Sequence, residues 1–173
     1  MKIITIFAKR LFAFQFEKER KNELSRLLDD WNDVGKLYQF ILENKYDAPM
    51  GFSIQELVEQ LIRNANEIDE NLFAISNDPN RDLGEFFKPL HNSEYRVLDL
   101  SKQKGRRSFL RIYALRIDEN CYVITGGAIK FHHLNKDRKH TKIEMEKLNL
   151  CRDYLKFHVV FDDASFYEFI NEN

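Results

Sequence analysis

The period of the apolar residues changes along the chain, and each change predicts a different kind of element. Residues 2–8 are mostly apolar and typical of a buried strand, while residues 11–16 either extend that strand or lead into a helix. From Glu17 the chain is charged, and its apolar residues recur at the spacing of one helical face. The first set predicts a helix: Leu24, Leu27, Leu28 and Trp31.

Two further helices are predicted before residue 76. Apolar residues between Val34 and Leu42 keep the helical spacing and predict a short helix. The clearest helix begins at Ser53, because "SIQE" is a capping box, and its apolar face continues to Ile68. Residues 76–84, "SNDPNRDLG", predict a loop. We expect the charged helices to pack through buried apolar residues: Leu24, Leu27, Leu57, Leu61 and Ile68.

After this loop the period becomes two. Residues 94–100, 107–117 and 121–131 are rich in β-branched and aromatic residues, and they predict an antiparallel meander whose first two strands are joined by a basic loop. Gly126 and Gly127 in the third strand indicate close approach of another part of the chain, since no phosphate-binding glycine pattern surrounds them.

The helical period returns after the meander. Thr141 and Glu144 have the spacing of a second capping box, and residues 164–170 predict one or two final helical turns. An apolar stripe accompanies that box: Ile143, Leu148, Cys151 and Leu155. The order of strand, helices, three strands and helix is typical of an α+β fold, with helices packed on one face of a mostly antiparallel sheet. We expect one domain, residues 1–173.

The composition favours a folded, water-soluble protein. It is 43% hydrophobic with only 6 Gly and 3 Pro, and no run approaches the roughly 18 apolar residues of a membrane span. Lys9 and Arg10 interrupt the N-terminal apolar run, which lacks a signal-peptide cleavage site, so we expect a cytoplasmic location. Cys121 and Cys151 are expected to be reduced and buried.

Charge is segregated along the chain, although the net charge is only −1. Residues 96–142 hold twelve Lys or Arg against four acids, giving +8, and the remainder carries −9. Four of the cations fall within residues 102–107. Such segregation is typical of a protein that binds a polyanion.

The C-terminal half resembles the RelE/ParE/HigB superfamily of bacterial toxins, most closely its HigB-like branch. The matching pieces lie within residues 85–156: Pro89 and Leu90, Tyr95 to Leu100, Leu110 to Tyr113, and Tyr122 to Lys130. The resemblance implies a RelE-like domain in which residues 17–85 are an acidic helical insert. It also implies a toxin that cleaves messenger RNA without a metal or other cofactor, free or on the ribosome, together with a cognate antitoxin.

In such a reaction a ribose 2'-oxygen attacks the adjacent phosphate, so cations and a proton donor or acceptor are needed. Arg111 matches the family's strand motif, and strand alternation places it on one face with Phe109, Tyr113 and Leu115. We expect the cation and its two aromatic neighbours to contact phosphate and unstacked bases. The alternative is that the aromatics are core residues past which Arg111 reaches solvent.

The remaining candidate residues flank that strand. The candidate catalytic residues are Arg96, Lys104, Arg111, Lys130 and His132, and the candidate RNA-binding residues are Lys102, Arg106, Arg107, Phe109 and Tyr113. We expect the charged ends of Arg96, Lys104, Arg111 and Lys130 to meet on one exposed face. His132 and His133 have no metal-ligand spacing and are either a proton-transfer group or surface residues.

Two other functions stay open from the sequence. The same fold in the ParE branch inhibits a host protein such as gyrase, and an inactive family member would act as a binding module. Aromatic residues beside a cationic rim favour RNA over both.

Overall fold

The N-terminus forms a hairpin at one edge of a mixed sheet. The computed structural model describes residues 1–90, 100–131 and 139–172. β1 (Lys2–Phe7) pairs antiparallel with β2 (Leu11–Gln15) through a turn in which Ala8 and Lys9 have positive φ angles. β1 is the outer strand and only partly buried, whereas β2 is mostly buried. The first predicted strand is therefore an edge strand, and the next apolar run is a separate strand.

Three helices follow, as predicted: α1 (Glu23–Asn32), α2 (Val34–Glu43) and α3 (Ile54–Asn77). The capping box is confirmed, since the Ser53 side chain accepts from the Glu56 N–H and the Glu56 carboxylate accepts from the Ser53 N–H. α3 continues past its predicted face, so the predicted loop begins later. The predicted packing residues are all buried: Leu24, Leu27, Leu57, Leu61 and Ile68.

The rest of the sheet comes from the second half of the chain. A 3-10 turn, η1 (Leu83–Glu85), leads into β3 (Phe87–Pro89), and β4 (Ser101–Arg107), β5 (Leu110–Asp118) and β6 (Cys121–Ile129) form the meander. The strand order is β1-β2-β6-β5-β4-β3. Every pair is antiparallel except β2 with β6, which is parallel. The α+β class is confirmed, with a mixed sheet.

The basic stretch predicted as a loop is itself β4. Its residues alternate between the two faces, with Ser101, Gln103 and Gly105 buried. Gly105 is needed there because a Cβ would lie 1.8 Å from the Phe86 ring. The strand predicted before it falls largely on residues 91–99, which lie outside the described residues.

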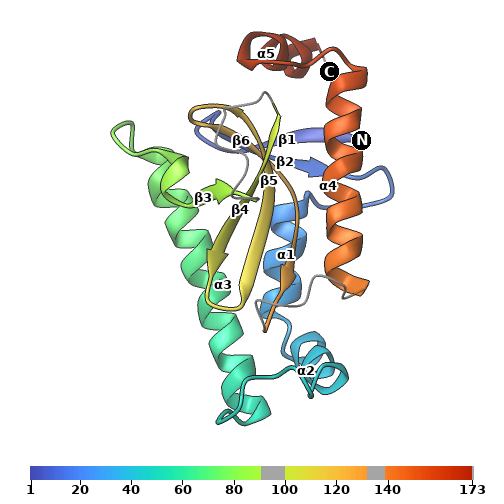
Figure 1. The fold of residues 1–173 in the computed structure, drawn as a ribbon. Helices are drawn as coiled ribbons and strands as arrows, with labels where there is room; N and C mark the ends of the chain where they lie inside the picture. The colour runs from blue at the N-terminus through green and yellow to red at the C-terminus, as the bar shows by residue number, and fades with distance from the viewer. Residues whose placement is uncertain (91–99, 132–138, 173) are drawn as a thin grey trace.

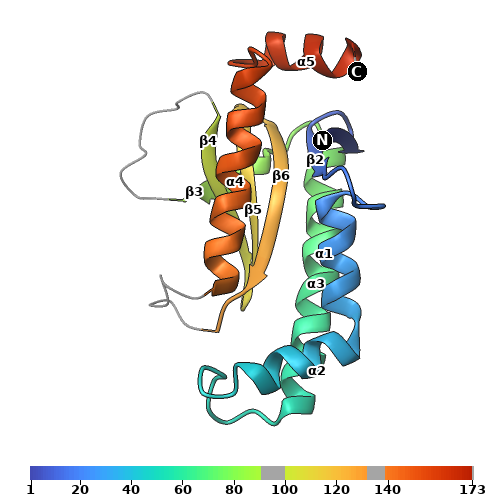
Figure 2. The same cartoon turned by 90° about the vertical axis from the view of Figure 1, so that its right-hand side faces the viewer.

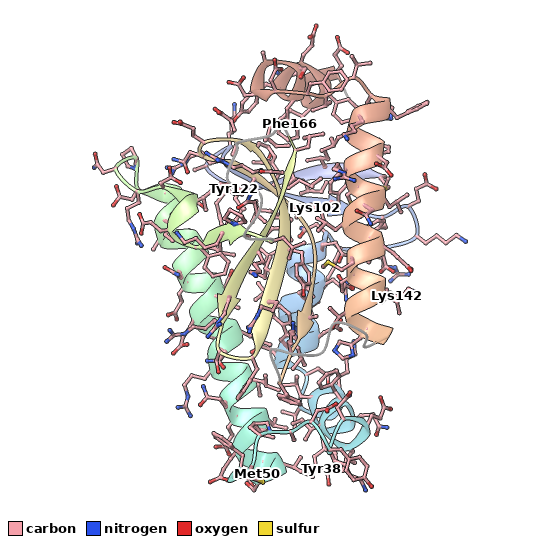
Figure 3. The ribbon with its side chains drawn as sticks, in the orientation of Figure 1. Tyr38, Met50, Lys102, Tyr122, Lys142 and Phe166 are labelled. Atoms are coloured by element: carbon pink, nitrogen blue, oxygen red, sulfur yellow. The ribbon has the colours of Figure 1, made fainter. Side chains whose placement is uncertain are left out.

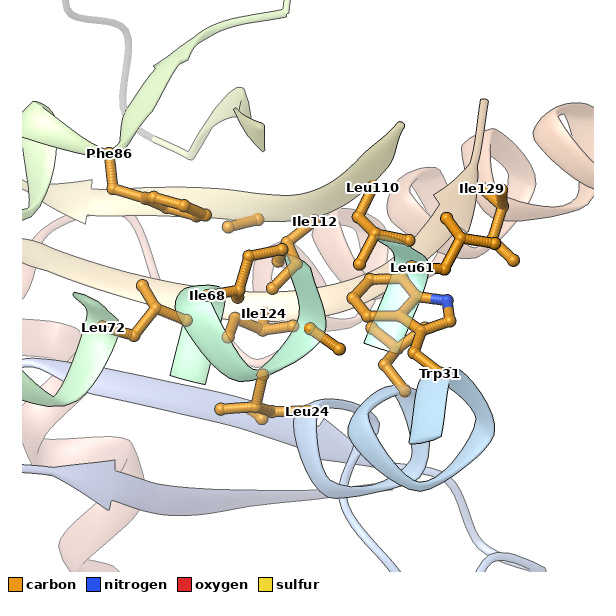
Figure 4. Close-up of a cluster of buried hydrophobic side chains, with 14 of the residues drawn as sticks. Leu24, Trp31, Leu61, Ile68, Leu72, Phe86, Leu110, Ile112, Ile124 and Ile129 are labelled. Atoms are coloured by element: carbon orange, nitrogen blue, oxygen red, sulfur yellow. The ribbon is translucent and has the colours of Figure 1, made fainter. Parts of the chain in front are cut away.

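Helices cover both faces of the sheet, and not one face as predicted. Figure 2 shows the sheet between α1 and α3 on one side and α4 (Lys139–Phe157) on the other. α5 (Asp163–Glu172) lies beyond the end of α4 in Figure 1. The first core lies against α1 to α3 and includes Trp31 and Ile112 (Figure 4). The second core joins the sheet to α4 and α5, and includes Phe166, labelled in Figure 3.

The predicted start of α4 is wrong. Thr141 lies inside the helix, where its buried hydroxyl has no hydrogen-bond partner, and Glu144 binds the sheet. The apolar stripe is confirmed for Leu148, Cys151 and Leu155, whereas Ile143 is exposed. In the described parts of the chain, no helix has the length and apolar character to cross a membrane.

Candidate functional site

Several cations lie on the side of the sheet that faces α4. β4 and β5 pair so that Lys104 lies opposite Tyr113 and Arg106 opposite Arg111, and opposite residues of an antiparallel pair point to the same face. Lys130 directly follows β6, and its pKa is lowered by partial burial and then by the charges of Arg111 and Lys104. We call Lys104, Arg106, Arg111 and Lys130 the cationic face. Lys104, Arg111 and Lys130 share one face as predicted, and Arg96 lies outside the described residues.

Arg111 is the buried member of the cationic face. Its side chain is 7% exposed, and one guanidinium nitrogen donates to the carbonyl oxygens of Ser108 at 2.6 Å and Leu110 at 2.9 Å. Burial, followed by the charge of Arg106, lowers its pKa. The expectation of an exposed Arg111 is therefore wrong, because this side chain ties down the β4–β5 turn and contributes positive potential from beneath the surface.

The cationic face carries no compensating acid among the described residues. No carboxylate in those ranges forms an ion pair with any of its four members. Lys104 donates to the carbonyl oxygen of Leu90 at 3.2 Å, and Arg106 is exposed. Arg107 differs, because it lies opposite Leu110 on the other face and pairs with Glu67 of α3.

The aromatic residues expected beside Arg111 are placed differently. Phe109 lies in the turn before β5, where it packs against the first core and against Phe131, with ring centroids 5.4 Å apart. Tyr113 shares the face of Arg111, but its ring is buried, and burial raises its pKa. Lys102 is half-buried opposite Leu115 on the same face, and His132 lies outside the described residues. The predicted pair of stacking rings around Arg111 is thus wrong.

A cavity lies beside the end of β6, beyond the point where β2 pairs with it. β2 pairs with β6 only as far as Ile124, so the end of β6 has no strand beside it on that side in the described sheet. The cavity there measures about 340 Å³ and is lined by α1, α2, the end of β6 and α4. Its apolar lining includes Leu27, Trp31, Leu37, Phe40 and Ile129, and its polar lining Arg26, Asp30, Lys36, His140 and Glu144. We call it the edge cavity.

Side chains of α4 bind the free edge of β6 beside this cavity. The Gly127 N–H donates to the Glu144 carboxylate at 2.9 Å, and His140 Nε2 lies 3.2 Å from the carbonyl oxygen of Ile129. Burial raises the pKa of Glu144, against the opposing effect of Lys147. A partly desolvated carboxylate in a cavity wall is able to accept a hydrogen bond from a ligand or to exchange a proton.

Behind this wall, buried charges connect α1 to α4. Glu23 is 2% exposed and pairs with Lys147 of α4 and with Arg26, whose nitrogen lies 2.8 Å from its carboxylate. Arg26 also pairs with Asp30 at 2.9 Å. Hydrogen bonding to Glu23 raises the pKa of Arg26 despite burial. These pairs hold the polar side of the edge cavity in place.

Sequence reasoning did not identify the edge cavity. Trp31 was predicted only as part of a helical stripe, and Glu144 as a helix cap. The spacing of Glu23, Arg26 and Asp30 at three and four residues was an available signal of ion pairing on one helix. The meeting of α1 with α4 had no local signal.

The thiol groups of the chain are buried. Cys121 and Cys151 are both free and buried, as predicted, and burial raises the pKa of Cys121 to about 12. Within the described ranges, no three His, Cys, Asp or Glu side chains are grouped to hold a metal ion.

Comparison with known proteins gives no relative. No protein-family model, no curated protein and no solved structure matches this chain significantly.

Proposed function

We propose that this chain binds single-stranded RNA through the cationic face and cleaves it, as the toxin of a toxin–antitoxin pair. One observation carries the proposal: four cations share one region of the sheet, and no described carboxylate pairs with any of them. Uncompensated cations at this density raise the free energy of the protein unless an anion binds. A phosphate backbone supplies regularly spaced anions.

The proposed cleavage is attack of a ribose 2'-oxygen on the adjacent phosphorus. The new bond closes a 2',3'-cyclic phosphate, and the bond from phosphorus to the 5'-oxygen breaks. Lys104 would bind the phosphate oxygens, and Lys130 would give a proton to the leaving 5'-oxygen, for which its lowered pKa suits it. His132 stays the candidate acceptor of the 2'-hydroxyl proton.

The test is RNA cleavage by the purified chain in the presence of a metal chelator. We expect single-stranded RNA to give 2',3'-cyclic phosphate and 5'-hydroxyl ends, and expression in a bacterial host to arrest growth with loss of transcripts. The double variant Lys104→Gln/Lys130→Gln should lower the rate by about 10²-fold or more, since one preorganised donor alone typically contributes that much. The log–log slope of RNA affinity against salt concentration should become shallower by roughly 0.7 for each phosphate that the variant no longer neutralises.

A charge-matched control is Lys18→Gln/Lys156→Gln, which removes two exposed lysines elsewhere. This control should cleave RNA like the wild type. Arg111→Ala is a poorer probe, because it also removes two hydrogen bonds to the β4–β5 turn. Growth arrest with intact transcripts would indicate a protein target such as gyrase, and RNA binding without cleavage would indicate an inactive binding module.

A further inference from the structure

The edge cavity has the size and walls of a site for one flat, polar ligand. Its volume of about 340 Å³ is near the lower end of ligand pockets, which measure roughly 300–1,000 Å³. Trp31 of α1 and Phe40 of α2 contribute aromatic rings to its lining. Trp31 is only 3% exposed, so the rest of its ring is fixed by the first core. Trp31 therefore meets the cavity only at the margin of its ring, and the partly exposed ring of Phe40 is the surface on which a base can stack.

Polar groups stand around the same space. Asp30, which pairs with Arg26 and Lys36, and Glu144 carry carboxylate oxygens that are able to accept a further hydrogen bond, and the Lys36 ammonium has N–H groups beyond the one that it gives to Asp30. Nucleobases combine a flat apolar face with a rim of donors and acceptors, and single-stranded RNA is recognised by stacking together with hydrogen bonds to that rim. The mixed lining of the edge cavity matches a nucleobase better than a purely apolar ligand.

The edge cavity adjoins the cationic face. Ile129 lines the cavity, and the next residue in the chain is Lys130. Ile129, Phe40 and His140 also line a second, smaller hollow that includes Lys130. A phosphate held by Lys130 would therefore lie beside the edge cavity.

We propose that the edge cavity holds one unpaired nucleobase of the RNA whose phosphates contact the cationic face. This inference rests on the proposed function, because it assigns the position of a base next to the phosphate contacts. Lys104 and Lys130 would supply affinity for the backbone, while Trp31, Phe40 and the surrounding carboxylates would select a flipped-out base.

The single tryptophan of the chain makes the inference directly testable. Trp31 is the only tryptophan and lines the edge cavity, so a change in tryptophan fluorescence comes from this residue. A short single-stranded RNA and an abasic oligonucleotide of equal length should be titrated into the wild-type chain. Binding is followed by the anisotropy of a dye on the oligonucleotide, and occupation of the cavity by quenching of Trp31. We expect both oligonucleotides to bind, but only the base-containing RNA to quench Trp31.

The variant Phe40→Ala should distinguish contacts with the base from contacts with the RNA backbone. Loss of one stacking ring should weaken binding of the base-containing RNA by roughly 5- to 150-fold and leave binding of the abasic oligonucleotide unchanged. Tyr38→Ala is the matched control, because Tyr38 is an exposed aromatic residue of the same helix and lies outside the cavity lining. Circular dichroism of both variants checks that the fold is kept, and the wild-type quenching experiment stands without any variant.

Each outcome decides between the two proposals. Equal affinity for both oligonucleotides with no quenching of Trp31 would overturn the cavity site and leave RNA binding by the cationic face intact. No binding of either oligonucleotide would overturn the proposed function itself. Quenching that persists unchanged in Phe40→Ala, with unchanged affinity, would also count against the cavity site.

Discussion

Two adjacent glycines of β6 let separate layers approach one strand from opposite sides. A Cβ on Gly126 would lie 1.9 Å from the Glu144 carboxylate, whereas a Cβ on Gly127 would lie 2.6 Å from the backbone oxygen of Arg111 and 2.8 Å from Leu27. The close approach predicted from these glycines is confirmed. The Gly126 contact is with the end of a side chain, but the Gly127 contact is with backbone and is much harder to relieve.

Gly127→Ala should therefore destabilise the protein. Because the new methyl group overlaps a strand backbone and a buried leucine, we expect the free energy of unfolding to fall by about 1–3 kcal/mol. Urea unfolding measured by circular dichroism checks this. Gly35→Ala is the control, since its Cβ would meet only the Asp33 carboxylate at 3.3 Å and Ala favours a helix. An unchanged midpoint for Gly127→Ala would show that the strands shift to make room.

For the cationic residues, the sequence predicts the face of the sheet better than the depth of burial. Arg111 lies on the face that strand alternation predicted, whereas Lys104 shares this face because the stretch predicted as a loop is a strand. Their exposure did not follow, because burial of Arg111 depends on the carbonyl groups of the β4–β5 turn. A sequence pattern predicts the face of a strand on which a side chain lies, but the burial of that side chain depends on its neighbours in space.

At the scale of elements, apolar periodicity found the α-helices and missed β4. β4 has Ser101, Gln103 and Gly105 on its buried face, so it lacks the apolar alternation by which strands are recognised. Those positions are polar or small because Phe86 fills the space over Gly105 and Gln103 donates to the Ser101 hydroxyl at 3.0 Å. A strand whose partners supply the apolar contact leaves almost no trace in its own sequence.

Two cysteines buried between β6 and α4 should make the protein less stable at alkaline pH. Cys121 of β6 and Cys151 of α4 are buried in the second core, and burial raises the pKa of Cys121 from 9.0 to about 12 and that of Cys151 further. The unfolded chain ionises its thiols near pH 9 while the folded chain keeps them protonated. The contribution of the two protonated thiols to the free energy of unfolding is therefore fully present below pH 9, and it is lost progressively as the pH rises above 9.

We expect each thiol to contribute a decline of up to about 1.4 kcal/mol per pH unit above pH 9. Cys121→Ala/Cys151→Ala should be less stable at pH 7, because it leaves space in the core, but its stability should decline less between pH 9 and 10. Urea unfolding at a series of pH values measures both effects. Parallel declines for the variant and the wild type would contradict this origin and point to the phenols, such as Tyr122.

At the scale of the whole molecule, the two helical layers are joined by charge. Glu23 of α1 and Lys147 of α4 pair beside the free end of β6, although their helices cover opposite faces of the sheet. The sequence predicted both helices and their apolar faces. It did not predict that α4 lies on the other face of the sheet. The face that a helix covers depends on which face the other helices leave open, and no local sequence pattern records this.

Removing one partner of this buried pair should be costly. Glu23→Ala leaves Lys147 and Arg26 without their shared carboxylate, and we expect a loss of about 3–5 kcal/mol in the free energy of unfolding. Lys147→Met combined with Glu23→Leu should lose less than the sum of the two single variants, because neither member of this pair is then left without the other. Lys142→Met, which removes an exposed lysine of the same helix, should have little effect. Additive losses in the double variant would show that the pair contributes no coupling.

The parallel pairing of β2 with β6 has a consequence for the time course of folding. Leu11 pairs with Tyr122, more than a hundred residues later in the chain. On the ribosome the N-terminal hairpin is therefore made long before the strand that receives it, and at roughly 5–20 residues per second the delay is about 6–22 seconds. During that interval the apolar side chains of β2 have no sheet to cover them. A chaperone that binds short hydrophobic segments would find a target in residues 11–16.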